Sequence, residues 1–227
     1  MNNQSAAKDQ QLEAFRGIQP ATVSDAMYSL GLKDTGFDPI VRLQSGQSVL
    51  GRARTVGRTP ITANAGQVEL APDYGFAIQE VIDGCSQNSV LVIATQGIAS
   101  HANFGGNMAH RASALGAVGL VTDGALRDLE EMPGFGLTIF SQGTSVRAGQ
   151  HRFATTVKNG PVICGGVLVT PDDIILGDAD GVILIPAEHA DEIARKSSEL
   201  LDLEHRMQAF MAEGNSLYDA VMKYKVR

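Results

Sequence analysis

The feature that most constrains the fold of this chain is residues 105–128, which read GGNMAHRASALGAVGLVTDGALRD. Two glycines precede a helical pattern over residues 108–115, and an apolar run over residues 118–121 follows it. A helix that leads within a few residues into a buried strand is typical of α/β folds, in which binding sites lie at strand ends. The segment therefore predicts an α/β domain with a site that joins the glycine pair to the residues beyond the strand.

The residues of this segment suit a small anionic ligand. Gly105 and Gly106 leave their backbone N–H groups open to close approach, at the start of a predicted helix, where anions bind readily. Arg127 offers a planar fork for a carboxylate, and Asp128 offers a hard oxygen ligand for a divalent metal. Adjacent side chains on a regular helix diverge by about 100°, so they would not both face one pocket. The alternative is therefore a solvated Arg-Asp pair that caps a short helix. Together with the glycine pair, these residues suit a small anionic substrate, such as a 2-oxo acid, held on a metal, and from the Arg-Asp pair alone the solvated pair is the more frequent case.

Other polar residues are expected to have structural roles. Asp123 ends the predicted strand before Gly124, and we expect it to form a turn rather than to bind a ligand. His101 and His110 flank the glycine pair, but their separation fits no helical metal-binding motif. We expect His101 at a pocket rim and His110 on the surface. Turns are also expected of the acidic residues at positions 172, 173, 178 and 180, which lack the spacing of an EF-hand loop.

Composition indicates a compact cytoplasmic domain. The 227 residues suit one domain with an added helical tail, and the formal charge of −7 argues against a nucleic-acid surface. No segment approaches the roughly 20 apolar residues of a membrane span, and the polar N-terminus lacks the apolar core of a signal peptide. Cys85 and Cys164 are far apart and have no CxxC partner, so we expect two reduced, buried thiols.

Hydrophobic periodicity and turn residues predict a layered fold. Strands alternate with helices in the middle of the chain and run together near residues 155–185, which favours a β/β/α layering over a doubly wound sheet. Thr22, with Asp25 three residues on, predicts a capping box at a helix start. The expected helices are 9–18, 22–30, 74–82, 108–115, a short one ending at 132, 187–212 and 218–226. The expected strands are 48–56, 89–94, 118–121, 137–140, 155–157, 162–169, 174–176 and 181–185.

The last predicted long helix, 187–212, gives the chain a C-terminal extension. We divide the sequence into a domain of residues 1–186 and a helical extension of the same domain, residues 187–227. Apolar residues recur along the helix at close to heptad spacing, at Ile193, Leu200, Met207 and Phe210. The helix either packs on its own domain or forms a subunit contact.

Several motifs resemble those of the RraA-like family, over roughly residues 20 to 187. They are residues 22–31 (TVSDAMYSLG), residues 51–56 (GRARTV), residues 124–128 (GALRD), Gly143, Thr144 and Arg147 of a GT.PR segment in which Val146 replaces proline, and residues 169–186 (VTPDDIILGDADGVILIP). The family includes class II 4-hydroxy-4-methyl-2-oxoglutarate aldolases, which also decarboxylate oxaloacetate, and RraA, a protein inhibitor of ribonuclease E. The resemblance implies a fold like the swivelling domain of phosphoenolpyruvate-utilising enzymes.

The resemblance also implies roles for the residues of the 105–128 segment. In the family's aldolases a four-residue backbone segment holds the substrate, which here is Gly105, Gly106, Asn107 and Met108. The catalytic pair then corresponds to Arg127, which binds the 2-oxo acid, and Asp128, which serves a Mg²⁺ or Mn²⁺ ion. One departure concerns Gly106, because the aldolases often carry Asp or Glu there. Metal affinity falls as a result, or Asn107 or a neighbouring subunit compensates.

These expectations combine into a metal-dependent carbon–carbon lyase that releases pyruvate from a small 2-oxo acid. The rival is a non-catalytic regulator like RraA, which binds a ribonuclease. Family members form trimeric rings, some paired into hexamers, so we expect a homotrimer or homohexamer with sites at subunit boundaries. We expect neither a nucleic acid nor a membrane as a partner.

Overall fold

The computed structural model describes residues 3–33, 35–44, 48–61, 72–150 and 152–225, and it divides into two compact units. One unit, the sheet unit, spans Thr35–Ala187, and the other, the helical unit, combines Met1–Asp34 with Glu188–Arg227. The division predicted from the sequence grouped the first 34 residues with the sheet. In the structure they pack with the C-terminal helices, α2 (Pro20–Ser29) against α5 (Ala190–Ala212), because the two helices bury apolar faces against each other.

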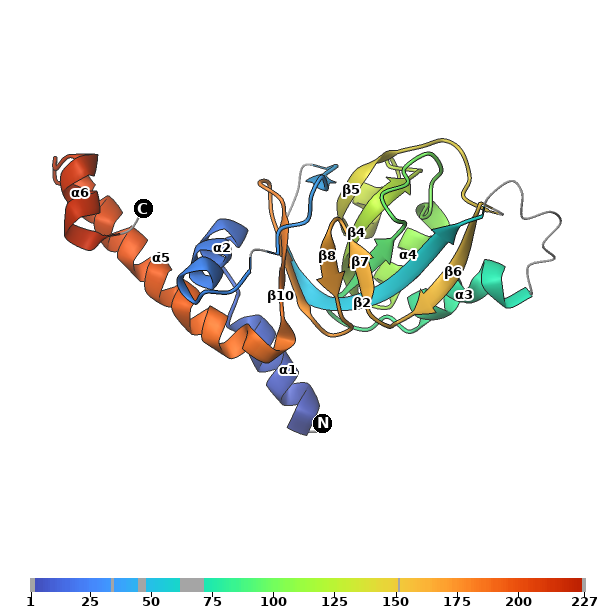
Figure 1. The fold of residues 1–227 in the computed structure, drawn as a ribbon, viewed down its shortest axis with the longest axis horizontal. Coiled ribbons are helices and arrows are strands. Elements are labelled where there is room, and N and C mark those ends of the chain that lie inside the picture. The colour runs from blue at the N-terminus through green and yellow to red at the C-terminus, as the bar shows by residue number, and fades with distance from the viewer. Residues whose placement is uncertain (1–2, 34, 45–47, 62–71, 151, 226–227) are drawn as a thin grey trace. The chain divides into compact units, whose positions relative to one another are not determined.

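A mixed sheet forms the centre of the sheet unit (Figure 1). Its strand order is β1-β5-β4-β3-β2-β9-β10, and β6 pairs with β2 off this path. The bounds are β1 (Val41–Arg42), β2 (Val49–Pro60), β3 (Ser89–Ala94), β4 (Ala117–Leu126), β5 (Thr138–Thr144), β6 (Phe153–Lys158), β9 (Ile174–Gly177) and β10 (Val182–Ile185). Strands β2 to β5 pair in parallel, and the other pairings are antiparallel. The α/β class is therefore confirmed.

The sheet is covered by a hairpin on one face and by helices on the other. Strand β3 is buried along its whole length, as its apolar sequence predicted, and its alternate residues divide between the two faces. Val90 and Val92 pack in one cluster with the hairpin of β7 (Val162–Cys164) and β8 (Val167–Val169). Leu91 and Ile93 pack in a second cluster with α3 (Pro72–Asp83) and α4 (Gly106–Ala114). The predicted β/β/α layering is confirmed.

Two predicted elements differ from the structure at turns. Residues 162–169 form a hairpin rather than one strand, because Gly165 and Gly166 reverse the chain at φ +51° and +77°. The short helix predicted to end at residue 132 is instead a turn that leads into the 3-10 helix η1 (Met132–Phe135). Pro133 lies within η1, where a proline is tolerated near the helix start.

The capping box predicted at Thr22 was wrong. Helix α2 begins at Pro20, and its cap residue Gln19 forms no side-chain cap hydrogen bond. Thr22 lies inside the helix and is buried. A proline at the first helical position fixes the helical φ, so the helix starts at Pro20 and Thr22 falls inside its first turn.

The helical unit also contains α1 (Asn3–Glu13), η2 (Ala187–His189) and α6 (Leu217–Tyr224). Helix α5 buries Ile193 in its first half, while Leu200, Met207 and Phe210 are half-buried further along. The predicted extension is thus helical, and its apolar stripe is only partly covered within one chain. None of the helices in the described ranges has the length and hydropathy to cross a membrane.

Candidate active site

The loops that follow β3 and β4 meet at one edge of the sheet. These strands are parallel, so their carboxyl ends lie side by side. Two backbone hydrogen bonds join the loops, from Asn103 N–H to the Ala125 carbonyl at 2.8 Å and from Arg127 N–H to the Phe104 carbonyl at 3.1 Å. The segment that leads into Gly105 therefore lies against the segment that carries Arg127, as the sequence predicted.

Asp128 connects this edge to the start of α4. Its Oδ2 atom accepts a hydrogen bond from Gly106 N–H at 2.9 Å, so the carboxylate caps a helix whose own cap residue, Gly105, has no side chain. Asp128 adopts a left-handed backbone conformation, with φ +62°. Aspartate is among the few residues that tolerate this conformation, and strained backbone of this kind clusters at functional sites.

Arg127 lies over the same helix start. Its Nε atom is 3.6 Å from Asp128 Oδ2, and the two side chains are 47% and 38% exposed. Solvent, and therefore a soluble ligand, can reach both groups. The contact with Asp128 involves Nε, which leaves the terminal guanidinium nitrogens as the pair suited to a two-point contact with a carboxylate.

The glycine pair lies beneath these side chains, and a larger residue at either position would have to displace one of them. A Cβ atom on Gly105 would lie 2.7 Å from Asp128 Oδ2 and 3.4 Å from Arg127 Nε. A Cβ atom on Gly106 would collide with Glu131 Oε2. The two glycines therefore let three charged side chains approach the backbone closely at the helix start.

Asn107 and Met108 supply the next two backbone amides of α4. The first intrahelical hydrogen bond joins Ala109 N–H to the Gly105 carbonyl, so these two earlier amides have no acceptor four residues back in the helix. The Asn107 side chain is exposed, whereas Met108 packs against the apolar cluster below the helix. The predicted four-residue segment thus forms the helix start, and its amides can bind an anion there.

Sequence reasoning missed Glu131. Its backbone N–H donates to the Asp128 carbonyl at 3.1 Å, which closes a turn and brings the Glu131 carboxylate to Gly106. The sequence signal for this contact is that Glu131 follows Asp128 by three residues, a separation that a tight turn brings onto one side of the backbone.

The donor set at this place fits a hard divalent cation. Asp128 and Glu131 present carboxylate oxygens beside adjacent glycines, and Mg²⁺ is commonly held by one or two carboxylates together with substrate oxygens and waters. Over the ranges that the structure describes, no three His, Cys, Asp or Glu side chains gather as a metal-binding group. A single chain therefore contributes at most part of a coordination shell here.

Asp123 has a structural role, but its predicted position was wrong. Strand β4 continues through Asp123 to Leu126, because Ala125 and Leu126 still pair with β5. The buried carboxylate accepts hydrogen bonds from Thr95 N–H at 2.5 Å, Thr95 Oγ1 at 3.1 Å and Gly97 N–H at 3.0 Å. It therefore holds the turn after β3, which begins the loop leading to the glycine pair.

The other acidic residues and the histidines have the structural roles expected of them. Asp173 accepts from Thr170 N–H and Ala187 N–H, and Asp178 accepts from Asp180 N–H, so these carboxylates stabilise turns. The exposed His110 packs edge-on against Phe135 at a ring separation of 5.6 Å. His101 lines an open, basic pocket of about 600 Å³, together with Arg147, Ala148, Gln150 and Arg152.

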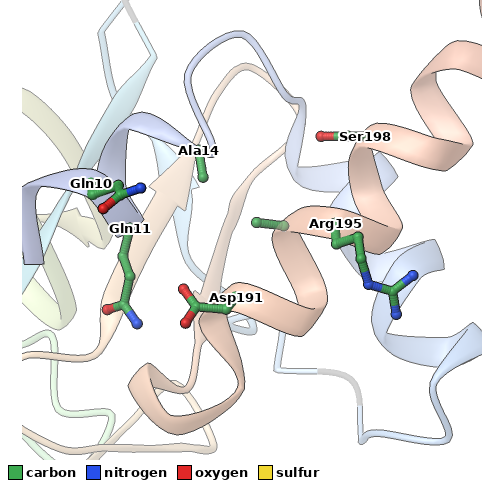
Figure 2. Close-up of a pocket in the computed structure, with 7 residues that line it drawn as sticks. Gln10, Gln11, Ala14, Asp191, Arg195 and Ser198 are labelled. Atoms are coloured by element: carbon green, nitrogen blue, oxygen red, sulfur yellow. The ribbon is translucent and has the colours of Figure 1, made fainter. Parts of the chain in front are cut away.

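The helical unit has a groove of its own, of about 480 Å³, between α1 and α5 (Figure 2). Its lining residues are Gln10, Gln11, Ala14, Asp191, Ala194, Arg195 and Ser198. Arg195 is already paired with Glu199 at 2.6 Å. The residues that the sequence predicted for the site all lie in the sheet unit, so this groove is a separate feature.

Comparison with known proteins gives relatives along most of the chain. A protein of Halalkalibacterium halodurans named "Putative 4-hydroxy-4-methyl-2-oxoglutarate aldolase" is 31% identical over 185 residues, which cover 82% of this chain and 80% of the relative. A protein of the same name from Xanthomonas campestris is 29% identical over 149 residues, which cover 66% of this chain and 84% of the relative.

Solved structures share the fold. A protein from Pseudomonas syringae pv. tomato superposes with a TM-score of 0.80 at 25% identity, covering 93% of this chain and 96% of that one. Streptomyces coelicolor RraAS2, described as an unusual member of the RNase ES inhibitor RraA protein family, superposes with a TM-score of 0.77 at 24% identity, covering 88% and 96%. The family model "RraA-like: Aldolase/RraA" matches residues 20–184, which include the whole site described above, and the chain belongs to the RraA-like family.

Proposed function

We propose that this protein is a carbon–carbon lyase that releases pyruvate from a small 2-oxo acid. The observation that carries the proposal is the position of the Asp128 carboxylate, 2.9 Å from Gly106 N and 3.6 Å from Arg127 Nε. One solvent-accessible place thereby holds a guanidinium that can bind a carboxylate, a hard oxygen ligand for a metal and a helix N-terminus. The aldolase names of two relatives support this class of reaction.

The residues of the helix start have distinct roles in this proposal. Arg127 binds the carboxylate of the pyruvoyl unit through its two terminal nitrogens, which fixes the plane of the 2-oxo acid. The amides of Asn107 and Met108 lie at the positive end of α4 and donate to the oxygen on which charge develops. A divalent cation held by Asp128, Mg²⁺ or Mn²⁺, would add Lewis-acid stabilisation of that charge.

The bond changes are the same for two substrates. In 4-hydroxy-4-methyl-2-oxoglutarate the C4 hydroxyl loses its proton, the C3–C4 bond breaks, and its electron pair leaves one pyruvate and the enolate of a second. In oxaloacetate the bond to the C4 carboxylate breaks, CO₂ leaves, and the same enolate remains. The enolate then takes a proton at carbon. We propose water as the proton carrier, because Arg127 and Asp128 are already engaged in binding.

The alternative is a non-catalytic regulator that binds a ribonuclease, as RraA does. The observation that favours it is Gly106, which stands where the family's aldolases often carry an acidic side chain. A site that has lost a metal ligand would be expected to lose turnover while keeping its fold. The two proposals differ in one measurable property, which is metal-dependent release of pyruvate.

The test is oxaloacetate decarboxylation by the purified full-length chain with Mg²⁺ or Mn²⁺, followed as pyruvate. Activity is expected above the rate of the metal alone, and EDTA is expected to abolish the gain. The matched variant is Asp128→Asn, because asparagine can still accept from Gly106 N–H and tolerates the positive φ while losing the charge. Loss of activity in a folded Asp128→Asn protein supports the lyase. Activity that survives both EDTA and Asp128→Asn contradicts the metal assignment, and no activity above the metal background favours the regulator.

A further inference from the structure

Arg58, near the end of β2, is a buried cation without a counter-charge. Its side chain is 7% exposed, and it forms no ion pair with any residue that the structure describes. One terminal nitrogen, Nη2, donates to the Phe153 carbonyl at 3.1 Å, whereas Nε has no hydrogen-bond partner. Burial lowers the pKa of the guanidinium to about 10, so the side chain is still charged at neutral pH.

Thr155 places a second unpartnered polar atom on the same face of the sheet. It is the direct antiparallel partner of Arg58, at the point where the register between β2 and β6 shifts. Side chains of such partners share a face, with Cβ atoms about 4.5–5.5 Å apart. Thr155 is 5% exposed, and its Oγ1 atom has no hydrogen-bond partner within the described part of the chain. A charged N–H group and a hydroxyl group therefore lack partners at neighbouring buried positions.

Phe153 fixes the direction of the arginine side chain. The guanidinium carbon of Arg58 lies 5.7 Å from the centre of the Phe153 ring, and Nη2 reaches the carbonyl of the same residue. Phe153 precedes Thr155 by two residues in β6, so the two side chains lie on one face. The arginine therefore starts opposite Thr155 and extends along β6 to Phe153. Its Nε atom comes before the guanidinium carbon on this path, on the side of Thr155.

Two kinds of small ligand can satisfy both atoms, and their charge distinguishes them. A buried water accepts from Nε–H and bonds to the hydroxyl, but it leaves the positive charge uncompensated. An anion accepts from Nε–H and from the hydroxyl, whose proton can rotate toward it, and it also supplies the missing negative charge. Because an unpaired buried charge costs far more than a buried polar group, the anion is favoured. Neither atom is accessible to solvent, so the ligand has to be small.

We propose that Arg58 and Thr155 form a buried binding site for a small monovalent anion such as chloride. The anion accepts hydrogen bonds from Arg58 Nε–H and from the Thr155 hydroxyl, and it neutralises the guanidinium. Since the two residues come from different strands, the site exists only where β2 and β6 are paired. Anion binding therefore stabilises the folded sheet unit. The inference does not depend on the proposed lyase function, whose residues lie at positions 105–108, 127 and 128.

Urea unfolding of the full-length protein tests the site through stability. Chloride is replaced stepwise by gluconate, which is too large for the site, at constant ionic strength. Raising chloride from zero to ten times its dissociation constant is expected to raise the folded-to-unfolded ratio about tenfold. Arg58→Met should remove this dependence and should be at least as stable as chloride-free wild type, because it replaces an unpaired buried charge with apolar volume. Thr155→Val keeps the shape without the hydroxyl and should weaken the dependence.

The matched control is Arg152→Met, which removes the charge of an exposed arginine next to β6 and should keep the chloride dependence. Anomalous diffraction from crystals grown in bromide locates the ion directly. A bromide peak in contact with both Arg58 Nε and Thr155 Oγ1 is expected in wild type and not in Arg58→Met. Equal chloride dependence of wild type and Arg58→Met, its loss in Arg152→Met, or a water without anomalous signal at this position would overturn the inference.

Discussion

The carboxylate of Asp128 accepts a hydrogen bond from the backbone amide of Gly106 at 2.9 Å, across 22 positions of the sequence. The bond joins the end of strand β4 to the start of helix α4, next to the backbone hydrogen bond from Arg127 N–H to the Phe104 carbonyl. It also gives Asp128 two functions, a structural one as a helix cap and a proposed one as a metal ligand. Substitutions at this residue therefore have to separate the two.

Stability should distinguish Asp128→Ala from Asp128→Asn. Alanine removes the cap, which costs about 1 kcal/mol, and it is disfavoured at φ +62° by about 1–2 kcal/mol. Asparagine retains an acceptor for Gly106 N–H and tolerates the left-handed conformation. We therefore expect the free energy of unfolding to fall by about 2 kcal/mol for alanine and by well under that for asparagine. Urea unfolding measures both, and equal losses would show that the cap contributes little.

Turnover should distinguish Arg127→Lys from wild type. A lysine keeps the positive charge near Asp128 but cannot form a two-point contact with a carboxylate. We expect kcat/KM for oxaloacetate to fall on the order of tenfold or more, corresponding to about 1.4 kcal/mol of transition-state stabilisation. Steady-state kinetics with saturating Mg²⁺ provide the measurement. Wild-type kinetics in a folded Arg127→Lys protein would remove Arg127 from its role as the substrate clamp.

Removal of the Asp123 carboxylate should destabilise the turn after β3 and lower the free energy of unfolding. The buried side chain accepts from Thr95 N–H, Thr95 Oγ1 and Gly97 N–H. Asp123→Ala leaves buried donors without an acceptor, and each such group costs about 1–3 kcal/mol. The expected loss in the free energy of unfolding is therefore about 3 kcal/mol. A loss below 1 kcal/mol by chemical denaturation would show that water replaces the carboxylate.

The two thiols should react slowly in the folded protein. Burial raises the pKa of Cys85 and raises the pKa of Cys164 well above its usual range, with a further increase from the charge of Asp123 near Cys164. Since the thiolate is the reactive form, a raised pKa slows reaction at a given pH. With Ellman's reagent at pH 8 we expect slow native reaction, slowest for the fully buried Cys164, and rapid reaction of both in guanidinium. A Cys164→Ala variant assigns the phases, and rapid native labelling of Cys164 would contradict its burial.

Assembly into trimers or hexamers remains a prediction. The structure adds two observations within one chain, the half-buried stripe of α5 at Leu200 and Met207 and the exposed cross-strand pair Ile163 and Leu168 on the β7–β8 hairpin. Exposed apolar surface of this kind marks contact sites. Light scattering should give a mass near three or six times 24.0 kDa, and dilution to monomers should reduce turnover. A fully active monomer would contradict both the assembly and a shared site.

The sequence by itself determined the parts of this protein that depend on local pattern. The apolar run of β3 defined a strand buried on both faces, and that strand is observed over Ser89–Ala94. The pattern of residues 105–128 predicted a helix over 108–115 and a strand over 118–121, which are observed as α4 (Gly106–Ala114) and the longer β4 (Ala117–Leu126). Such features depend on side-chain periodicity and turn residues within a short window, so one sequence suffices to read them.

Only the tertiary structure decided which distant groups meet. The parallel register of β3 and β4 brings the loop before Gly105 against Arg127, and the positive φ of Asp128 turns Glu131 back onto Gly106. The same holds for Asp123, whose strand continues because its neighbours pair with β5. These contacts arise from strand register and from single backbone angles, which are set by packing across the whole sheet. A local sequence window carries propensities for such angles but not the through-space partners that fix them.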